Sequence, residues 1–297
     1  MNSTRQSLWM LVASFLFACM GVCVKFAAQR YSAAEVVFYR SVISLTLMFV
    51  IVRWQGVAFS TPHWRLQFFR GASGFVSLLL YFYAIALLPL ATAVTLNYTS
   101  PLFLVAFLAT FGQMRMPRRM LGALFAGFVG VALLLRPTLG AEQWLGGLIG
   151  LGSGVLAGLA YFNVRALGAL GEPESRTVFY FSLLSSAGAI LWLGVFNRFA
   201  FQPIDSEGAL LLAGVGIFAT FAQLAMTRAY RQGNAILSAS LAYSAVIFAS
   251  IFGVIFWGEH LGLDAWLAIT LIVGSGMVAT RLSRRRPAEV INPAEQD

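Results

Sequence analysis

The sequence predicts an all-α integral membrane protein with ten transmembrane helices arranged as two inverted five-helix repeats. Three observations predict it: the composition, a series of apolar segments, and an internal repetition. Of the 297 residues, 59% are hydrophobic and 10% are charged, and the mean hydropathy is +0.81. A soluble domain could not bury that much apolar surface in one core. Most of the chain is therefore expected to lie in lipid.

Ten apolar segments have about the 20 residues that are needed to cross roughly 30 Å of hydrocarbon. They lie near residues 8–27, 33–52, 71–88, 91–112, 119–135, 146–167, 177–196, 208–228, 234–256 and 264–281. In hydrocarbon every backbone N–H and C=O group needs an internal partner, so these segments are expected to be helices. The polar stretches between them are too short for a soluble domain. Function must therefore lie within or between the spans.

A pentapeptide near the start of the second span returns near the start of the seventh. Val-Phe-Tyr-Arg-Ser at 37–41 reappears as Val-Phe-Tyr-Phe-Ser at 178–182. An odd number of membrane crossings separates the two copies, so they must have opposite orientations in the bilayer. Inverted repeats of this kind are typical of secondary transporters, whose binding sites lie near the midplane between the repeats.

A second alignment extends the repetition and sets the domain limits. Residues 89–137 align on 233–281 with a shift of 144, which places Ser100 on Ser244. We expect a first repeat at 1–137, a second, inverted repeat at 138–281, and a basic cytoplasmic tail at 282–297.

The positive charges predict the orientation, because Lys and Arg in short loops are retained in the cytoplasm. With the N-terminus inside, 15 basic residues, Arg70 among them, fall on the cytoplasmic side, 4 fall outside, and Arg40 lies within a span. Both termini are thus expected in the cytoplasm. The net charge of +9 reflects this topology and requires no nucleic acid partner. The first span is too long for a signal-peptide core and is read as a retained helix.

Four sequence elements carry a family resemblance. They are Glu35-Val-Val-Phe-Tyr-Arg-Ser, Tyr83-Ala-Ile-Ala-Leu-Leu-Pro-Leu-Ala-Thr-Ala followed by Pro101, the segment from Gly127 to Pro137, and Gly258-Glu259. In this order the chain resembles the drug/metabolite transporter superfamily, and within it the ten-helix proteins built from two EamA domains. The resemblance implies a carrier of small organic solutes, commonly an exporter of amino acids or related metabolites in a bacterial inner membrane. It does not fix the substrate.

Arg40 is the one basic residue expected within a span, where a guanidinium must pair, reach the interface or face a wet cavity. One interpretation is that it binds a substrate carboxylate, for which its planar donor fork is suited. The other is a structural tether to loops or to Glu35 at the outer helix end. Lys25 and Glu35 flank a short outer connection and could pair there, as a gate or as interfacial anchors.

Polar and aromatic residues near the midplane are the remaining candidates for substrate binding, because polar side chains in apolar helices usually face the bundle. These candidates are Tyr81, Asn97, Tyr98, Ser100, Pro101, Tyr161, Gln223, Ser240, Tyr243 and Ser244. Pro101 removes a backbone donor and permits a kink. Hydrogen bonding that only joins helices competes for the hydroxyls. A pocket of rings with few polar groups would suit amphipathic or aromatic solutes.

Gly146, Gly150, Gly154 and Gly158 recur every four residues and share one helix face. Such a stripe lets another helix approach closely. We expect close packing at a moving interface, or alternatively an oligomer contact. The protein is expected to be a monomer or a homodimer.

Several functions are set aside by what the sequence lacks. There is no phosphate-binding Gly-x-x-x-x-Gly-Lys-Ser/Thr loop. The two histidines and two cysteines predict neither a metal site nor a cofactor, and no intramembrane hydrolase motif is present. With no acidic residue deep in a span, facilitated diffusion or exchange is favoured over proton coupling. Proton-coupled efflux of lipophilic cations and uptake of a charged metabolite stay open; a membrane enzyme or receptor is disfavoured.

Overall fold

The computed structural model describes residues 3–111, 119, 122, 125–127, 129–130, 133, 143–197, 201–232, 238, 241–259 and 262–283. Every regular element in these ranges is helical, which confirms the all-α prediction. Six of the described helices are long and apolar enough to cross a membrane. Most of the predicted span at 119–135 and the tail after 283 lie outside the described residues.

The helices of the first half coincide with the predicted spans, except at the start of α4. They are α1 Ser3–Ser7, α2 Trp9–Ala27, α3 Ala33–Trp54, α4 Trp64–Leu87, α5 Leu90–Asn97 and α6 Ser100–Thr110. Those of the second half are α8 Trp144–Ala169, α9 Glu174–Asn197, α10 Ser206–Gln232, α12 Ser244–Trp257 and α13 Leu263–Ser283.

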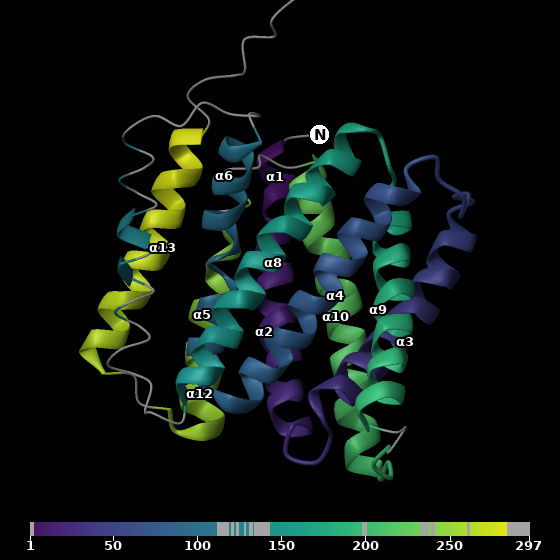
Figure 1. The fold of residues 1–297 in the computed structure, drawn as a ribbon, viewed down its shortest axis with the longest axis horizontal. Helices are drawn as coiled ribbons and strands as arrows, with labels where there is room; N and C mark the ends of the chain where they lie inside the picture. Colours follow the sequence, from purple (N-terminus) through teal and green to yellow (C-terminus); the bar gives the residue numbers. More distant parts are fainter. Residues whose placement is uncertain are drawn as a thin grey trace, which may run out of the picture.

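The two halves run in opposite directions through one bundle (Figure 1). From the end that holds the N-terminus, α2 runs away while its counterpart α8 runs toward it; α3 and α9, and α4 and α10, are likewise antiparallel. The chain thus has the inverted arrangement that the pentapeptide predicts. The start of α1 and the last turn of α13 lie at the same end of the bundle (Figure 1).

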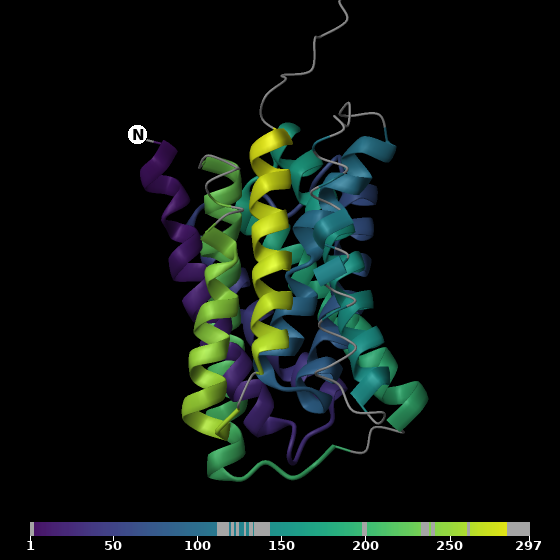
Figure 2. The ribbon, with the colours of Figure 1, turned by 90° about the vertical axis from the view of Figure 1, so that its left-hand side faces the viewer.

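The most extensive helix contacts each join a helix of the first half to a helix of the second half. These pairs are α2 with α10, α3 with α9, α3 with α10, α4 with α8, and α4 with α9. These six helices surround the centre of the bundle. α13 lies at its edge, where it contacts α6 (Figure 2). Large apolar side chains such as Leu191, Leu210 and Ile255 remain exposed on the outside, as expected of a surface that faces lipid.

α4 begins at Trp64, seven residues before the predicted span at 71–88, so the predicted start is wrong. The first two turns contain Arg65, Gln67 and Arg70, which lower the local hydropathy. Gln67 and Arg70 are nevertheless buried, because neighbouring helices cover this end of α4.

Both repeats interrupt a helix at the same place. α5 ends at Asn97 and α6 begins at Ser100, directly before Pro101. In the second half, a turn at Tyr243 precedes α12, although the residue equivalent to Pro101 is Ala245. The second interruption therefore does not depend on a proline. The Ser14 hydroxyl of α2 donates to the Ala242 carbonyl oxygen at 3.3 Å, which partly satisfies the backbone freed there.

Candidate functional site

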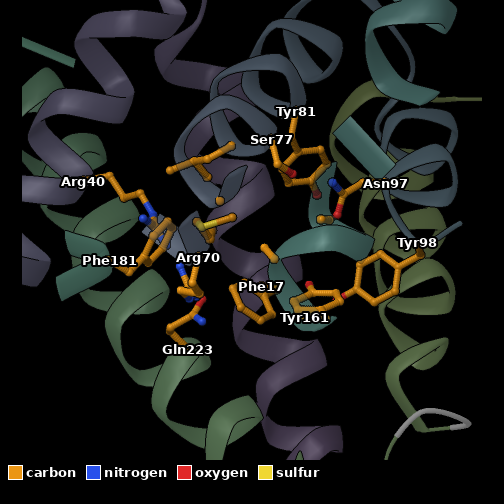
Figure 3. Close-up of a pocket in the computed structure, with 15 residues that line it drawn as sticks. Phe17, Arg40, Arg70, Ser77, Tyr81, Asn97, Tyr98, Tyr161, Phe181 and Gln223 are labelled. Carbon is orange, nitrogen blue, oxygen red and sulfur yellow. The ribbon is translucent and has the colours of Figure 1, made fainter. Parts of the chain in front are cut away.

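A cavity lies at the centre of the bundle, lined by residues from both repeats (Figure 3). It contains about 620 Å³ of space not filled by atoms, part of it open to the surroundings. Six of the predicted binding residues line it, namely Arg40, Tyr81, Asn97, Tyr98, Tyr161 and Gln223.

Four other predicted binding residues that the structure describes do not line this cavity. Ser100, Pro101 and Tyr243 are buried in packing, and Ser244 donates to the Leu241 carbonyl oxygen at 2.6 Å. Ser240 lies outside the described residues. Tyr98 lines the cavity and Tyr243 does not, although they lie at similar depth; the shift of 144 pairs Tyr243 with Thr99. A one-residue offset turns a side chain by about 100° around a helix, so the same depth gives a different direction.

Arg40 and Arg70 reach the cavity from opposite ends of the bundle. Arg40 lies seven residues into α3 and Arg70 six residues into α4, about 10 Å from each helix start at 1.5 Å per residue. Both guanidiniums lie against the ring of Phe181 on α9, with Cζ to ring-centroid distances of 5.2 Å for Arg40 and 3.9 Å for Arg70. Arg40 and Phe181 occupy equivalent positions in the two repeats.

Neither arginine of this pair has a carboxylate partner among the described residues. Arg40 is 2% exposed and Arg70 3% exposed, and the Nε and Nη1 atoms of both lack a hydrogen-bond partner there. The interpretation of Arg40 as a tether to Glu35 is wrong. The Glu35 carboxylate instead accepts from the backbone N–H groups of Ser32 at 2.8 Å and Gln202 at 2.7 Å.

Arg70 is the principal site residue that the sequence analysis missed, since it was counted as a loop residue. A signal for it existed. Arg70, Gly74, Ser77 and Tyr81 continue one face of α4 at helical spacing, and all four line the cavity. A stripe of small and polar residues that ends in an arginine indicates a buried, functional face.

The far side of the cavity is neutral and rich in aromatic rings. Figure 3 shows Tyr81, Tyr98 and Tyr161 across Phe17 from the arginine pair. Asn97 is held there by its Nδ2 atom, which donates to the Ser153 Oγ atom at 3.1 Å. Among the residues that the structure describes, the lining contains no Asp or Glu. The cavity thus combines a cationic end with a hydrogen-bonding aromatic end.

An ion pair joins the two repeats at the end of the bundle away from the N-terminus. Lys25 of α2 pairs with Glu259, which follows α12; the expected pairing of Lys25 with Glu35 is therefore wrong. The Glu259 carboxylate also accepts from the Leu90 N–H at 2.9 Å, at the start of α5. The Glu35 carboxylate is instead used in a capping box at the start of α3 and in its contact with the Gln202 N–H.

A second carboxylate joins the repeats at the opposite end. Glu172, between α8 and α9, accepts from Gln67 Nε2 at 3.4 Å, from Thr61, and from Arg176 Nη1 at 3.1 Å. An acidic residue thus connects the two repeats at each end of the bundle: Glu172, which is buried, and Glu259, which is partly buried.

An exposed cluster lies beside the connection between α2 and α3. Arg30 contacts Glu207 and Asp205, each at 2.7 Å, and these carboxylates raise the pKa of Arg30. The backbone N–H of Gly208 lowers the pKa of Asp205. These ion pairs are solvent-exposed, so they are expected to add little stability.

The four glycines of α8 face the end of α4 and the interrupted helix α5–α6. A Cβ atom on Gly146 would lie 3.0 Å from Leu88, and one on Gly150 3.0 Å from Leu96. On Gly154 it would lie 2.6 Å from the Leu96 carbonyl oxygen, and on Gly158 2.9 Å from that of Ser100. The stripe therefore lies at an interface within the bundle.

Comparison with known proteins gives consistent matches over nearly the whole chain. The EamA-like transporter family matches twice, at residues 4–136 and 144–281. A pseudopaline exporter of Pseudomonas aeruginosa is 34% identical over 251 residues, covering 84% of this chain and 86% of that protein. A riboflavin transporter of Brucella anthropi is 25% identical over 276 residues, covering 92% and 97%.

A solved crystal structure at 21% sequence identity superimposes with a TM-score of 0.71 over 96% of this chain and 100% of that chain. This likeness supports the fold.

Proposed function

Because the chain belongs to the EamA-like transporter family of the drug/metabolite transporter superfamily, we propose that it exports small amphipathic solutes that carry a carboxylate, such as amino acids and related metabolites. The observation that carries this proposal is Arg40, a buried guanidinium that faces a central cavity and has no anionic partner among the described residues. A bound carboxylate would supply the missing partner through a charge-assisted, bidentate contact.

The cavity position supports transport by alternating access. It lies between the repeats, where secondary transporters bind their substrates. The Lys25–Glu259 pair would close one side and the Glu172 contacts the other, so that opening one set while keeping the other exposes the cavity to one side at a time.

We favour a bacterial inner membrane with both termini in the cytoplasm. Because Arg70 belongs to α4, the cytoplasmic loops contain 14 basic residues instead of 15, against 4 outside. The excess of positive charge on the cytoplasmic side therefore remains large. The Lys25–Glu259 pair would then be the outer closure. The name of the Pseudomonas relative supports export as the direction of net flux.

The absence of an acidic residue from the cavity lining supports exchange or facilitated diffusion. Lipophilic cations are a poor fit, because two buried positive charges would repel them. Glu259 at the rim is the residue through which weak proton coupling could still occur.

The test is counterflow in liposomes. The purified protein is reconstituted with an internal amino acid panel, and uptake of each labelled member is followed with and without a pH gradient. Saturable exchange that ignores the gradient would support the proposal. Flux only with the gradient would contradict passive exchange, and no exchange of any carboxylate solute would contradict the proposed function.

The two tyrosines near the helix interruptions are expected to behave differently. Tyr98→Ala should change the order of substrate preference, because Tyr98 lines the cavity. Tyr243→Ala should instead lower the free energy of unfolding by about 3–5 kcal/mol, the usual cost of removing a large buried ring, because Tyr243 is 2% exposed. Tyr243→Phe is the matched control, since the hydroxyl has no partner among the described residues. Unaltered preference in Tyr98→Ala would remove that residue from the site.

Lys25→Met is expected to destabilise the protein by about 1–3 kcal/mol, because it leaves the partly buried Glu259 carboxylate without its counter-charge. The double variant Lys25→Met/Glu259→Gln should recover part of this loss. Thermal unfolding in detergent would measure both. Arg30→Gln, in the exposed cluster, should have little effect; additive losses for Lys25 and Glu259 would show that the pair is not coupled.

A further inference from the structure

We propose that the cavity takes solutes with two carboxylate groups, one bound by Arg40 and the other by Arg70. This inference rests on the carrier function proposed above and narrows its substrate class. It assigns Arg70 as a specificity-determining residue.

The charge of the cavity is the first argument. Two guanidiniums, each nine-tenths or more buried, enter it without a carboxylate in its lining. Burying a charge is costly unless the charge is paired and hydrogen-bonded. A monocarboxylate would neutralise one of the two arginines and leave the other uncompensated, whereas a dicarboxylate neutralises both.

The geometry favours two separate anionic groups over a single shared one. The arginines come from different helices, and in the view of Figure 3 the ring of Phe181 lies between them. A guanidinium binds a carboxylate through parallel donors in one plane. Each guanidinium also keeps its own Nε and Nη1 donors without a partner among the described residues, so we expect each arginine to take its own group.

Gly74 fixes this arrangement on the α4 side. A Cβ atom there would lie 2.9 Å from Arg70 Nη1 and 2.9 Å from Phe181 Cε2. A side chain at this position would displace the end of Arg70 or the Phe181 ring, whereas glycine leaves Arg70 over the ring at a Cζ to centroid distance of 3.9 Å. This contact holds the guanidinium in place by a cation–π interaction that leaves its Nε and Nη1 donors unpaired.

The rest of the solute would lie at the neutral end of the cavity. Tyr81, Tyr98, Tyr161 and Asn97 offer ring faces and neutral hydrogen-bonding groups there, which suit an uncharged body or an aromatic ring. The substrate class is thus an amphipathic dicarboxylate, with both acidic groups at one end.

The test compares matched solutes that differ only in the second carboxylate. N-benzoylglutamate and N-benzoylglutamine, and glutamate and glutamine without the benzoyl group, are compared as competitors of counterflow in liposomes. For the wild-type protein we expect each dicarboxylate to compete about tenfold better than its amide, the size of one charge-assisted hydrogen bond.

Arg70→Gln should abolish this preference by weakening the dicarboxylates about tenfold or more while changing the amides little. Arg70→Lys, which keeps the charge but loses the fork, should give an intermediate preference. Arg65→Gln, at the exposed start of the same helix, is the matched control and should retain the wild-type preference.

Equal competition by acid and amide in the wild-type protein would overturn the inference. An equal loss for both in a monodisperse Arg70→Gln protein would overturn it as well, leaving Arg70 a packing residue. If Arg70→Gln does not fold, the inference is tested by the preference for acid over amide in the wild-type protein and by its reduction in Arg70→Lys. Exchange of monocarboxylates without this preference leaves the carrier proposal intact, whereas no saturable exchange of any solute contradicts that proposal itself.

Discussion

Arg40→Gln is expected to reduce carboxylate exchange about 100-fold while the protein stays folded in the membrane. The guanidinium is buried, lies beside the cavity and has no carboxylate partner among the described residues. Its N–H donors are therefore available to a solute. Hydrogen bonds to charged groups contribute about 1.5–3 kcal/mol, and a bidentate contact contains two of them. Counterflow in liposomes at equal protein content measures the effect.

The chain offers a matched control on the same helix. Arg53→Gln removes an exposed arginine near the end of α3 and should leave exchange unchanged. Arg40→Lys should recover only part of the activity, because an ammonium lacks the planar fork. Wild-type flux in Arg40→Gln would reduce Arg40 to a scaffold residue.

Gly154→Val is expected to destabilise the protein by about 1–3 kcal/mol, the usual cost of overpacking a core. A Cβ atom on Gly154 would lie 2.6 Å from the Leu96 carbonyl oxygen, and a backbone atom in a helix cannot rotate away. α8 would have to move from α5, and it would carry Tyr161 with it. We therefore expect a lower unfolding temperature in detergent together with weaker exchange.

Gly152→Ala is the control for this prediction. It lies on the same helix, where a Cβ atom would meet only Leu80 Cδ1 at 3.6 Å, an ordinary contact. This variant should be as stable as the wild-type protein or up to about 1 kcal/mol more stable, because alanine favours a helix over glycine. Equal stability of Gly154→Val and Gly152→Ala would show that α8 does not need the close approach.

Some site residues could be predicted from the sequence and others could not, for different physical reasons. The pentapeptide at 37–41 identified Arg40 as a charged residue within a span. In the structure its guanidinium lies against the ring of Phe181, the equivalent residue of the second repeat. The alignment at a shift of 144 gave the depth of Tyr98 and Tyr243 but not their directions. Arg70 was not predicted as a site residue, because the low hydropathy around it put the predicted start of this helix at residue 71 instead of Trp64.

The amino-acid sequence alone was enough to predict that this protein lies in lipid and in which order its spans follow one another. Insertion into lipid depends on the length and hydropathy of each segment, and both are local properties that can be read without any contact. The family followed in the same way, from motifs that keep their order along the chain.

Helix packing was needed to show which side of each helix faces the centre of the bundle and which residues far apart in the sequence are in contact. Lys25 and Glu259 are 234 positions apart, and their pairing depends on how α2, α5 and α12 pack. The cavity likewise exists because α3, α4 and α9 bring Arg40, Arg70 and Phe181 together. The rotation of a helix about its axis is set by all of its neighbours at once, so no single segment of sequence contains it.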